Sequence, residues 1–166
     1  MISNDNNEYL TGGGSATVNG QTSKHDVTLE NRFAWDTARS HLRQEWRISR
    51  CPSDSTYVQL EMLDDNQTHV EGGQEYLYKY LAYWRIATAS ALKSNVELYF
   101  TGCGDSSQVV SEGTQYSGAK YSLEDQSGGV YKIVTNLGKY VKEATGQGSR
   151  VTLSDSSGQW NIRCLE

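Results

Sequence analysis

A short aromatic motif recurs along this chain of 166 residues and constrains its fold more than any other feature. The pattern Trp-x-Ile begins at Trp46, Trp84 and Trp160, and Tyr121-Ser122-Leu123 is a weaker copy. Trp84 lies 38 positions after Trp46, and Trp160 lies 76 positions after Trp84, which is twice that interval. Similar segments at a fixed spacing indicate a fold built from repeated units, with the recurring indoles in its core.

A second motif separates strand-like segments. Thr-Gly-x-Gly followed by Ser or Asp occurs at 11–15, 101–105 and 145–149, each time between two runs of β-branched and aromatic residues. Segment 129–164 contains four such runs, divided by Gly, Asn, Ser and Asp, which favour tight turns. The unit is therefore predicted to be four short strands.

The two motifs give different counts of units. Thr-Gly-x-Gly gives three units near 1–50, 81–126 and 127–166, whereas the aromatic motif gives four, with 51–84 as the second. Runs 57–63 and 68–71, joined by four residues, predict a β-hairpin. We favour one domain of three units, with 51–80 as an inserted hairpin.

Two further segments have specific predictions. The tyrosine-rich run 75–84 favours a strand, because aromatic residues are enriched in sheets. Segment 34–42 predicts a single helical turn, with Asp36 as its cap.

The composition excludes several functions. A net charge of -5 and the lack of any basic run longer than a pair argue against nucleic-acid binding. No apolar stretch is long enough to span a bilayer, and no signal peptide is visible, so a cytoplasmic chain and a secreted one without its leader both remain open.

Three cysteines allow at most one internal disulfide. Cys51 and Cys164 each follow a Trp-x-Ile run by a few residues, so a bridge between them is one hypothesis, and three free thiols are the other. Neither the cysteines nor the histidines have ligand spacings, and no metal or cofactor is predicted.

The closing unit resembles the ricin-B-type lectin repeat. The resemblance is carried by Tyr131-Lys132-Ile133, by segment 136–141, by Val151 and by Gln159-Trp160, and Gln44-Glu45-Trp46 matches the Gln-x-Trp of that family. It implies a β-trefoil of three four-strand repeats, in which the Trp packs into the core and the Gln bonds to the backbone. Galactose-binding repeats carry an Asp near the start of their second strand, where this chain has Thr11 and Lys142.

The resemblance also points to a binding loop. In ricin-type lectins the loop before the fourth strand supplies the aromatic ring on which a sugar stacks, and here it contains Trp35. The candidate ligand-binding residues around this ring, which offer donors and acceptors to sugar hydroxyls, are Glu30, Asn31, Arg32 and Asp36. The alternative is that Phe33 and Trp35 cap the open end of a barrel.

The equivalent loop of the second unit contains Tyr116 with Glu112 beside it, whereas 154–157 in the last unit has no ring. No residues form a recognisable catalytic set. The sequence therefore predicts a carbohydrate-binding protein, not an enzyme, whose partner is a glycan or glycoprotein, and a homodimer is compatible with it. The alternatives are a trefoil protease inhibitor acting through 51–80, and the receptor-binding component of a toxin or defence assembly.

Overall fold

The chain is an all-β protein, as predicted. The computed structural model describes residues 1–18, 21–37, 39–71, 73–86, 96–103, 106–110, 113–142 and 148–165. Within these ranges the elements, in chain order, are β1 (Ile2–Ser3), β2 (Tyr9–Val18), β3 (Gln21–Glu30), the 3-10 turn η1 (Ser40–Gln44), β4 (Trp46–Arg50), β5 (Val58–Met62), β6 (Thr68–Glu71), β7 (Gln74–Leu77), β8 (Tyr80–Ile86), β9 (Glu97–Tyr99), β10 (Ser106–Val110), β11 (Gly113–Gly118), β12 (Tyr121–Asp125), β13 (Val130–Thr135), β14 (Tyr140–Lys142), β15 (Thr152–Ser154) and β16 (Trp160–Ile162).

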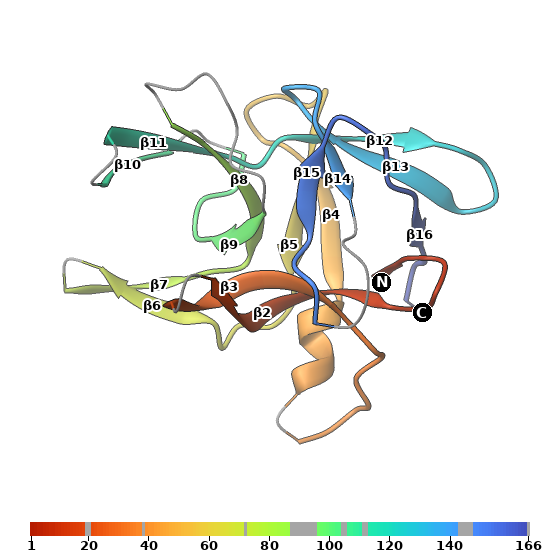
Figure 1. Cartoon of the computed structure of the whole chain (residues 1–166), viewed down its shortest axis with the longest axis horizontal. Coiled ribbons are helices and arrows are strands. Elements are labelled where there is room, and N and C mark those ends of the chain that lie inside the picture. The colour runs from red at the N-terminus through yellow and green to blue at the C-terminus, as the bar shows by residue number, and fades with distance from the viewer. Residues whose placement is uncertain are drawn as a thin grey trace.

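Six strands from distant parts of the chain are neighbours. They are hydrogen-bonded in the order β1, β16, β13, β12, β5 and β4, and every pairing between them is antiparallel. Because β16 pairs with β1, the two ends of the chain lie close together (Figure 1).

Three strand pairs cover this group of six. These pairs are β2 with β3, β8 with β9, and β14 with β15. They meet where the Val151 amide donates to the Val27 carbonyl at 2.9 Å and the Val96 amide donates to the Val151 carbonyl at 3.4 Å. All three valines are fully buried, so each pair contributes to one shared core.

The same side-chain bond occurs three times in the core. An aromatic residue at the start of β4, β12 or β16 donates to a backbone carbonyl in β2, β8 or β14. The three bonds, each 2.9 Å long, run from Trp46 Nε1 to Leu10, from the Tyr121 hydroxyl to Leu81, and from Trp160 Nε1 to Val141. Burial raises the pKa of Tyr121, which keeps its hydroxyl protonated as a donor. The weak fourth copy of the aromatic motif thus corresponds structurally to Trp46 and Trp160.

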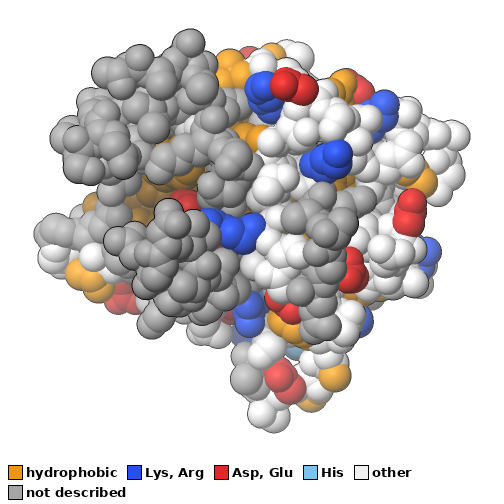
Figure 2. Space-filling view, viewed as in Figure 1, with side chains coloured by type: hydrophobic (Ala, Val, Ile, Leu, Met, Phe, Trp, Pro, Cys, Tyr) orange, Lys and Arg blue, Asp and Glu red, His pale blue; other side chains and the backbone are white. Residues whose placement is uncertain are grey.

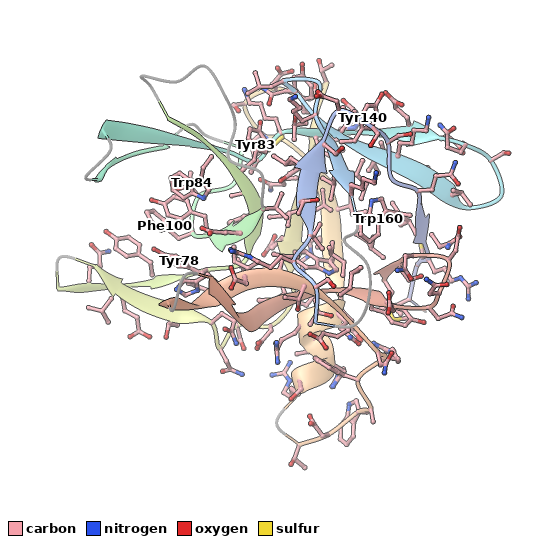
Figure 3. All side chains as sticks on the ribbon, viewed as in Figure 1. Tyr78, Tyr83, Trp84, Phe100, Tyr140 and Trp160 are labelled. Atoms are coloured by element: carbon pink, nitrogen blue, oxygen red, sulfur yellow. A yellow bond between two sulfur atoms is a disulfide. The ribbon has the colours of Figure 1, made fainter. Side chains whose placement is uncertain are left out.

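Trp84 belongs to the core, as predicted, but is not part of this threefold set. It lies in β8 and contacts Tyr99 edge to face, with ring centroids 4.8 Å apart. Tyr78 and Phe100 extend the same aromatic cluster (Figure 3). The 38-residue interval between Trp46 and Trp84 therefore does not mark equivalent strands. The run 75–84 forms the end of β7 and most of β8, which confirms its strand prediction.

The predicted hairpin between 57–63 and 68–71 is wrong. β5 pairs with β4 along its whole length and also with β8 and β12, whereas β6 pairs with β7. A loop of suitable length joins β5 to β6, but β5 pairs with strands of the core instead. Its side chains Leu60 and Met62 are buried there, whereas Val70 of β6 is exposed.

Both hypotheses for the cysteines are wrong: Cys51 and Cys164 are not bridged to each other, and the three thiols are not all free. Cys51 is bonded to Cys103, and Cys164 is a free, exposed cysteine. Cys51 follows β4 and Cys164 follows β16, and no pairing among the described strands joins these two. Although Cys51 and Cys164 each follow a Trp-x-Ile strand, these two strands are not neighbours, so the motif does not bring the two sulfurs together.

Candidate functional site

The segment between β3 and β4 projects from the body of the molecule. It contains an irregular stretch after Glu30 and then η1, and its coiled turn stands at the bottom of Figure 1. The predicted helical turn is therefore present but begins at Ser40, later than expected. Contrary to the prediction, Asp36 is not the cap of this turn, because Arg39 holds the N-cap position and no side chain caps it. Asp36 Oδ1 does accept a hydrogen bond from the Ser40 amide at 3.0 Å, which ties the preceding segment to the start of η1.

Gln44 fixes the base of this loop. Its fully buried side chain donates to the Asn31 carbonyl at 2.8 Å and to Thr11 Oγ1 at 3.1 Å, and it accepts from the Phe33 amide at 2.8 Å. The resemblance to ricin-B-type repeats predicted that this Gln bonds to the backbone, and the geometry confirms it. The loop is consequently held in a defined conformation by a residue that is itself immobilised in the core.

Arg43 fixes the same loop from the other side. Its Nε donates to the Gly12 carbonyl at 2.7 Å, and its guanidinium carbon lies 5.3 Å from the centroid of the half-buried Phe33 ring. Burial lowers the pKa of Arg43. Phe33 thus packs against Arg43 within this loop.

Trp35 has a different environment. Its side chain is 76% exposed, the largest value among the exposed large hydrophobic residues described. The closest described ring is that of His41, with centroids 6.0 Å apart. Trp35 does not cap a barrel, and its indole is available to a partner.

The four other predicted residues of this loop lie around its base and tip. Asn31, Arg32 and Asp36 are exposed, and Glu30 is half-buried at the end of β3. Arg32 is partly engaged, because it lies 4.0 Å from Glu45 Oε1 and 5.8 Å from the centroid of the Tyr9 ring. Glu30 Oε1 accepts from the Thr28 hydroxyl at 3.2 Å.

The prediction that Tyr116 lies in a second binding loop is wrong. This residue lies in the middle of β11, paired with Ser107 of β10 and Arg85 of β8. Alternating polar residues in this stretch resemble a turn in sequence, but they suit an exposed strand equally well. Glu112 lies outside the described residues, as does the position of the Tyr116 side chain.

The positions that hold Asp in galactose-binding repeats are occupied differently here. Thr11 is fully buried, with its hydroxyl donating to the Tyr9 carbonyl at 2.8 Å, and Lys142 donates to Ser156 Oγ at 2.9 Å. Neither residue supplies an acceptor like the Asp.

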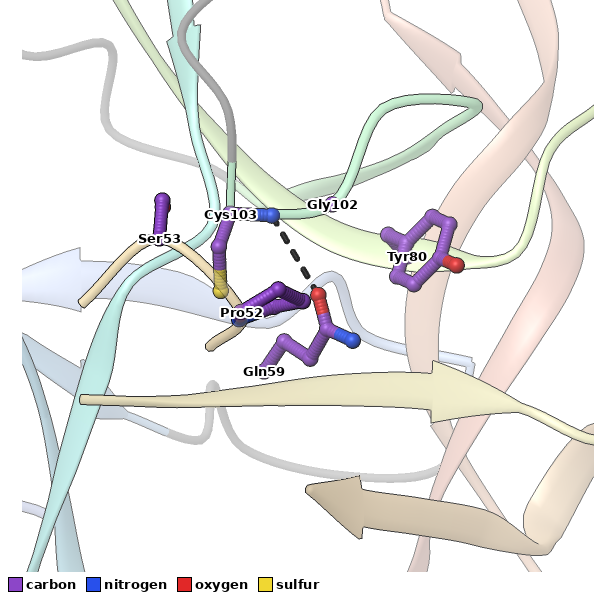
Figure 4. Close-up of a pocket in the computed structure, with 6 residues that line it drawn as sticks. All are labelled: Pro52, Ser53, Gln59, Tyr80, Gly102 and Cys103. Carbon is purple, nitrogen blue, oxygen red and sulfur yellow. Dashed lines mark hydrogen bonds between the residues drawn. The ribbon is translucent and has the colours of Figure 1, made fainter. Parts of the chain in front are cut away.

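A pocket of about 310 Å³, which was not predicted from the sequence, lies beside the disulfide (Figure 4). Its lining residues are Pro52, Ser53, Gln59, Tyr80, Gly102 and Cys103. The Cys103 amide donates to Gln59 Oε1 across it at 3.3 Å. Only the cysteines carried a sequence signal, and that signal suggested a different pairing. A second, mainly apolar cavity of about 320 Å³ includes Trp46, Ile48 and Ile162.

None of the described residues forms a group of three or more His, Cys, Asp or Glu suited to a metal ion. Among the same residues, no helix has the length and apolar character to cross a membrane. On the face shown in Figure 2, the described Lys and Arg side chains are scattered and do not form one patch.

Comparison of the chain with protein-family models, with curated proteins and with solved structures finds no match.

Proposed function

We propose that the fold is a β-trefoil. Three features support this: the six-strand order β1, β16, β13, β12, β5, β4, the three covering pairs that meet at one buried point, and the threefold aromatic bonds. In this proposal β5, β8, β9 and β12 form the second unit. The additions to that unit are then the ribbons β6–β7 and β10–β11, not the whole of 51–80.

We propose further that the protein binds carbohydrate through the loop between β3 and β4. The observation that carries this proposal is Trp35, a large apolar ring that is 76% exposed on a loop held by the buried Gln44. A rigid exposed ring loses little conformational freedom when a partner binds, so contact with it contributes to affinity.

The polar groups near this ring suit a sugar. Sugars present both hydroxyl groups and an apolar C–H face, and Asn31, Arg32 and Asp36 offer amide, guanidinium and carboxylate groups around Trp35. Asp36 uses one carboxylate oxygen to accept from the Ser40 amide, which leaves the other oxygen as an acceptor. Both charge signs are present, so recognition of a neutral ligand is favoured over that of a strongly charged one.

A glycan array tests this proposal. The wild type is expected to bind a defined set of glycans, and Trp35→Ala is expected to weaken that binding by at least about tenfold, the effect of about 1.4 kcal/mol. The Tm of Trp35→Ala should stay nearly unchanged, because the indole makes little contact with the core. Leu137→Ala is a matched control, since Leu137 is 51% exposed in the distant turn between β13 and β14 and should not affect binding.

A second candidate function is protease inhibition through the β6–β7 ribbon. Its strands pair only with each other among the described elements, and Val70 is 63% exposed on it. A projecting ribbon with an apolar side chain could occupy a protease cleft. If this is the function, replacing residues 68–77 with a short Gly-Ser linker will abolish inhibition of a serine or cysteine protease, whereas Trp35→Ala will leave it intact.

A further inference from the structure

We propose that the pocket beside the Cys51–Cys103 disulfide is a second sugar subsite, which accepts one neutral pyranose ring. The inference rests on the proposed carbohydrate-binding function but concerns different residues from the Trp35 loop. A volume of about 310 Å³ lies at the lower end of the range for small-ligand sites. It therefore suits one ring and not an extended chain.

The walls of the pocket are fixed relative to each other. The disulfide joins the segment after β4 to the segment after β9, and both segments line the pocket. The bond between the Cys103 amide and Gln59 ties the second segment to β5 as well. A pocket whose walls are held by a covalent bond does not have to be ordered by its ligand, which reduces the cost of binding.

Gly102 makes room for the side chains that line the pocket. A Cβ at this position would overlap Gln59 Oε1 and lie 3.1 Å from Tyr80 Cε1. With glycine there, the backbone approaches both side chains closely. Figure 4 shows Gly102 next to Cys103, with the side chains of Gln59 and Tyr80 below it. The ring of Tyr80 and the amide of Gln59 thus border the same space.

The polar groups of the pocket match hydroxyl ligands. The Gln59 amide accepts from Cys103 and donates to Ser49 Oγ at 3.3 Å, which leaves one N–H and further acceptor capacity on the oxygen. The hydroxyl of the exposed Ser53 is a donor and an acceptor at the mouth. A sugar ring could place its apolar face against Tyr80 and its hydroxyl groups toward Gln59 and Ser53.

The charge around the pocket favours a neutral ligand. None of its six lining residues carries a charge. Lys79 Nζ lies 5.5 Å from the centroid of the Tyr80 ring, and its charge is compensated by Glu61, whose Oε1 is 2.7 Å away. An anionic or cationic ligand would lose hydration there without gaining a partner.

The test is a titration of ¹⁵N-labelled protein, followed by the amide signals in NMR spectra. The probes are the methyl pyranosides of glucose, galactose, mannose and N-acetylglucosamine, with cyclohexanol as a ring of similar size that has a single hydroxyl. At least one glycoside is expected to shift the Gly102 and Cys103 amide signals saturably. The Kd of cyclohexanol from the same signals should be at least about tenfold higher. Tyr80→Ala should raise the Kd of the glycoside by a similar factor.

Two variants separate this inference from the proposed Trp35 site. Tyr140→Ala is the matched control, because Tyr140 is half-buried and precedes Val141 as Tyr80 precedes Leu81, each of which accepts a core aromatic bond. Trp35→Ala and Tyr140→Ala should both keep the Gly102 and Cys103 shifts.

The location of the shifts decides between the two proposed sites. Shifts confined to residues 31–36 would overturn the pocket subsite and leave the Trp35 site standing. Shifts confined to the pocket residues would overturn the Trp35 site and leave the pocket subsite standing. Equal binding of cyclohexanol, or full binding by Tyr80→Ala, would also overturn the inference.

Discussion

Replacing both Cys51 and Cys103 with alanine is expected to lower the free energy of unfolding by about 4 kcal/mol. The two cysteines are 52 positions apart, and closing a loop of that length removes much of the freedom of the unfolded chain. A chain of this size should then melt about 10 °C lower. Thermal and urea unfolding of the oxidised wild type and the double variant measure the difference.

Cys164→Ser is the matched control for this prediction. Cys164 is exposed and unbridged, so its replacement should change the free energy of unfolding by less than about 0.5 kcal/mol. A tryptic map without reductant should contain the peptides of Cys51 and Cys103 joined to each other. A map in which Cys164 is joined to Cys51, together with a destabilised Cys164→Ser variant, would contradict the pairing.

Arg150→Met is expected to destabilise the protein by about 3–5 kcal/mol. Arg150 pairs with Asp26, whose side chain is fully buried, and it lies 3.3 Å from Glu97 Oε1. Asp26 is in β3, Glu97 is in β9, and Arg150 lies just before β15. One guanidinium thus joins the three covering strand pairs where they meet, and its loss leaves the buried carboxylate without that partner.

A double variant and a surface pair test this explanation. Adding Asp26→Asn to Arg150→Met removes the buried negative charge and should restore part of the lost stability, measured by urea unfolding. The control is Lys139→Met, which breaks a pair with the exposed Asp155 and should cost at most about 1 kcal/mol. If Arg150→Met costs no more than Lys139→Met, the charge pair is not a major stabilising contact.

Much of the framework was predictable because it is encoded locally. β-branched and aromatic runs between turn residues predicted the last four strands, and Trp46 and Trp160 are buried as their recurrence indicated. The Gln-x-Trp resemblance predicted that Gln44 bonds to the backbone. Its backbone partners, Asn31 and Phe33, lie in the loop that leads to Gln44, so this role is encoded locally. Local patterns of this kind depend on residues near each other in sequence.

The errors concern contacts between distant segments. The run at β5 looked like a hairpin arm of β6, but burial of Leu60 and Met62 against other strands decides its pairing. Cys103 follows a short strand, β9, whose place beside β8 and β3 determines which cysteine it meets. The buried pair of Asp26 and Arg150 had no sequence signal for the same reason.

The candidate site was predictable only in part. Trp35 stood out because it lies outside the recurring aromatic motif, and its exposure agrees with a binding role. Tyr116 was assigned to a loop, yet it lies in β11, because a polar strand and a polar loop have similar compositions. The disulfide-bordered pocket combines β5, β8 and the segments around two cysteines, so it becomes visible only in three dimensions.

The most direct test of carbohydrate binding at Trp35 is acrylamide quenching of tryptophan fluorescence, with and without a glycan that binds on the array. Trp46, Trp84 and Trp160 are at most 9% exposed, so quenching reports mainly on Trp35. We predict that the saturating glycan protects the wild type from quenching, and that Trp35→Phe, which keeps a ring but removes the indole, loses this protected component. Unchanged quenching of the wild type by acrylamide at saturating glycan would show that the sugar does not contact Trp35.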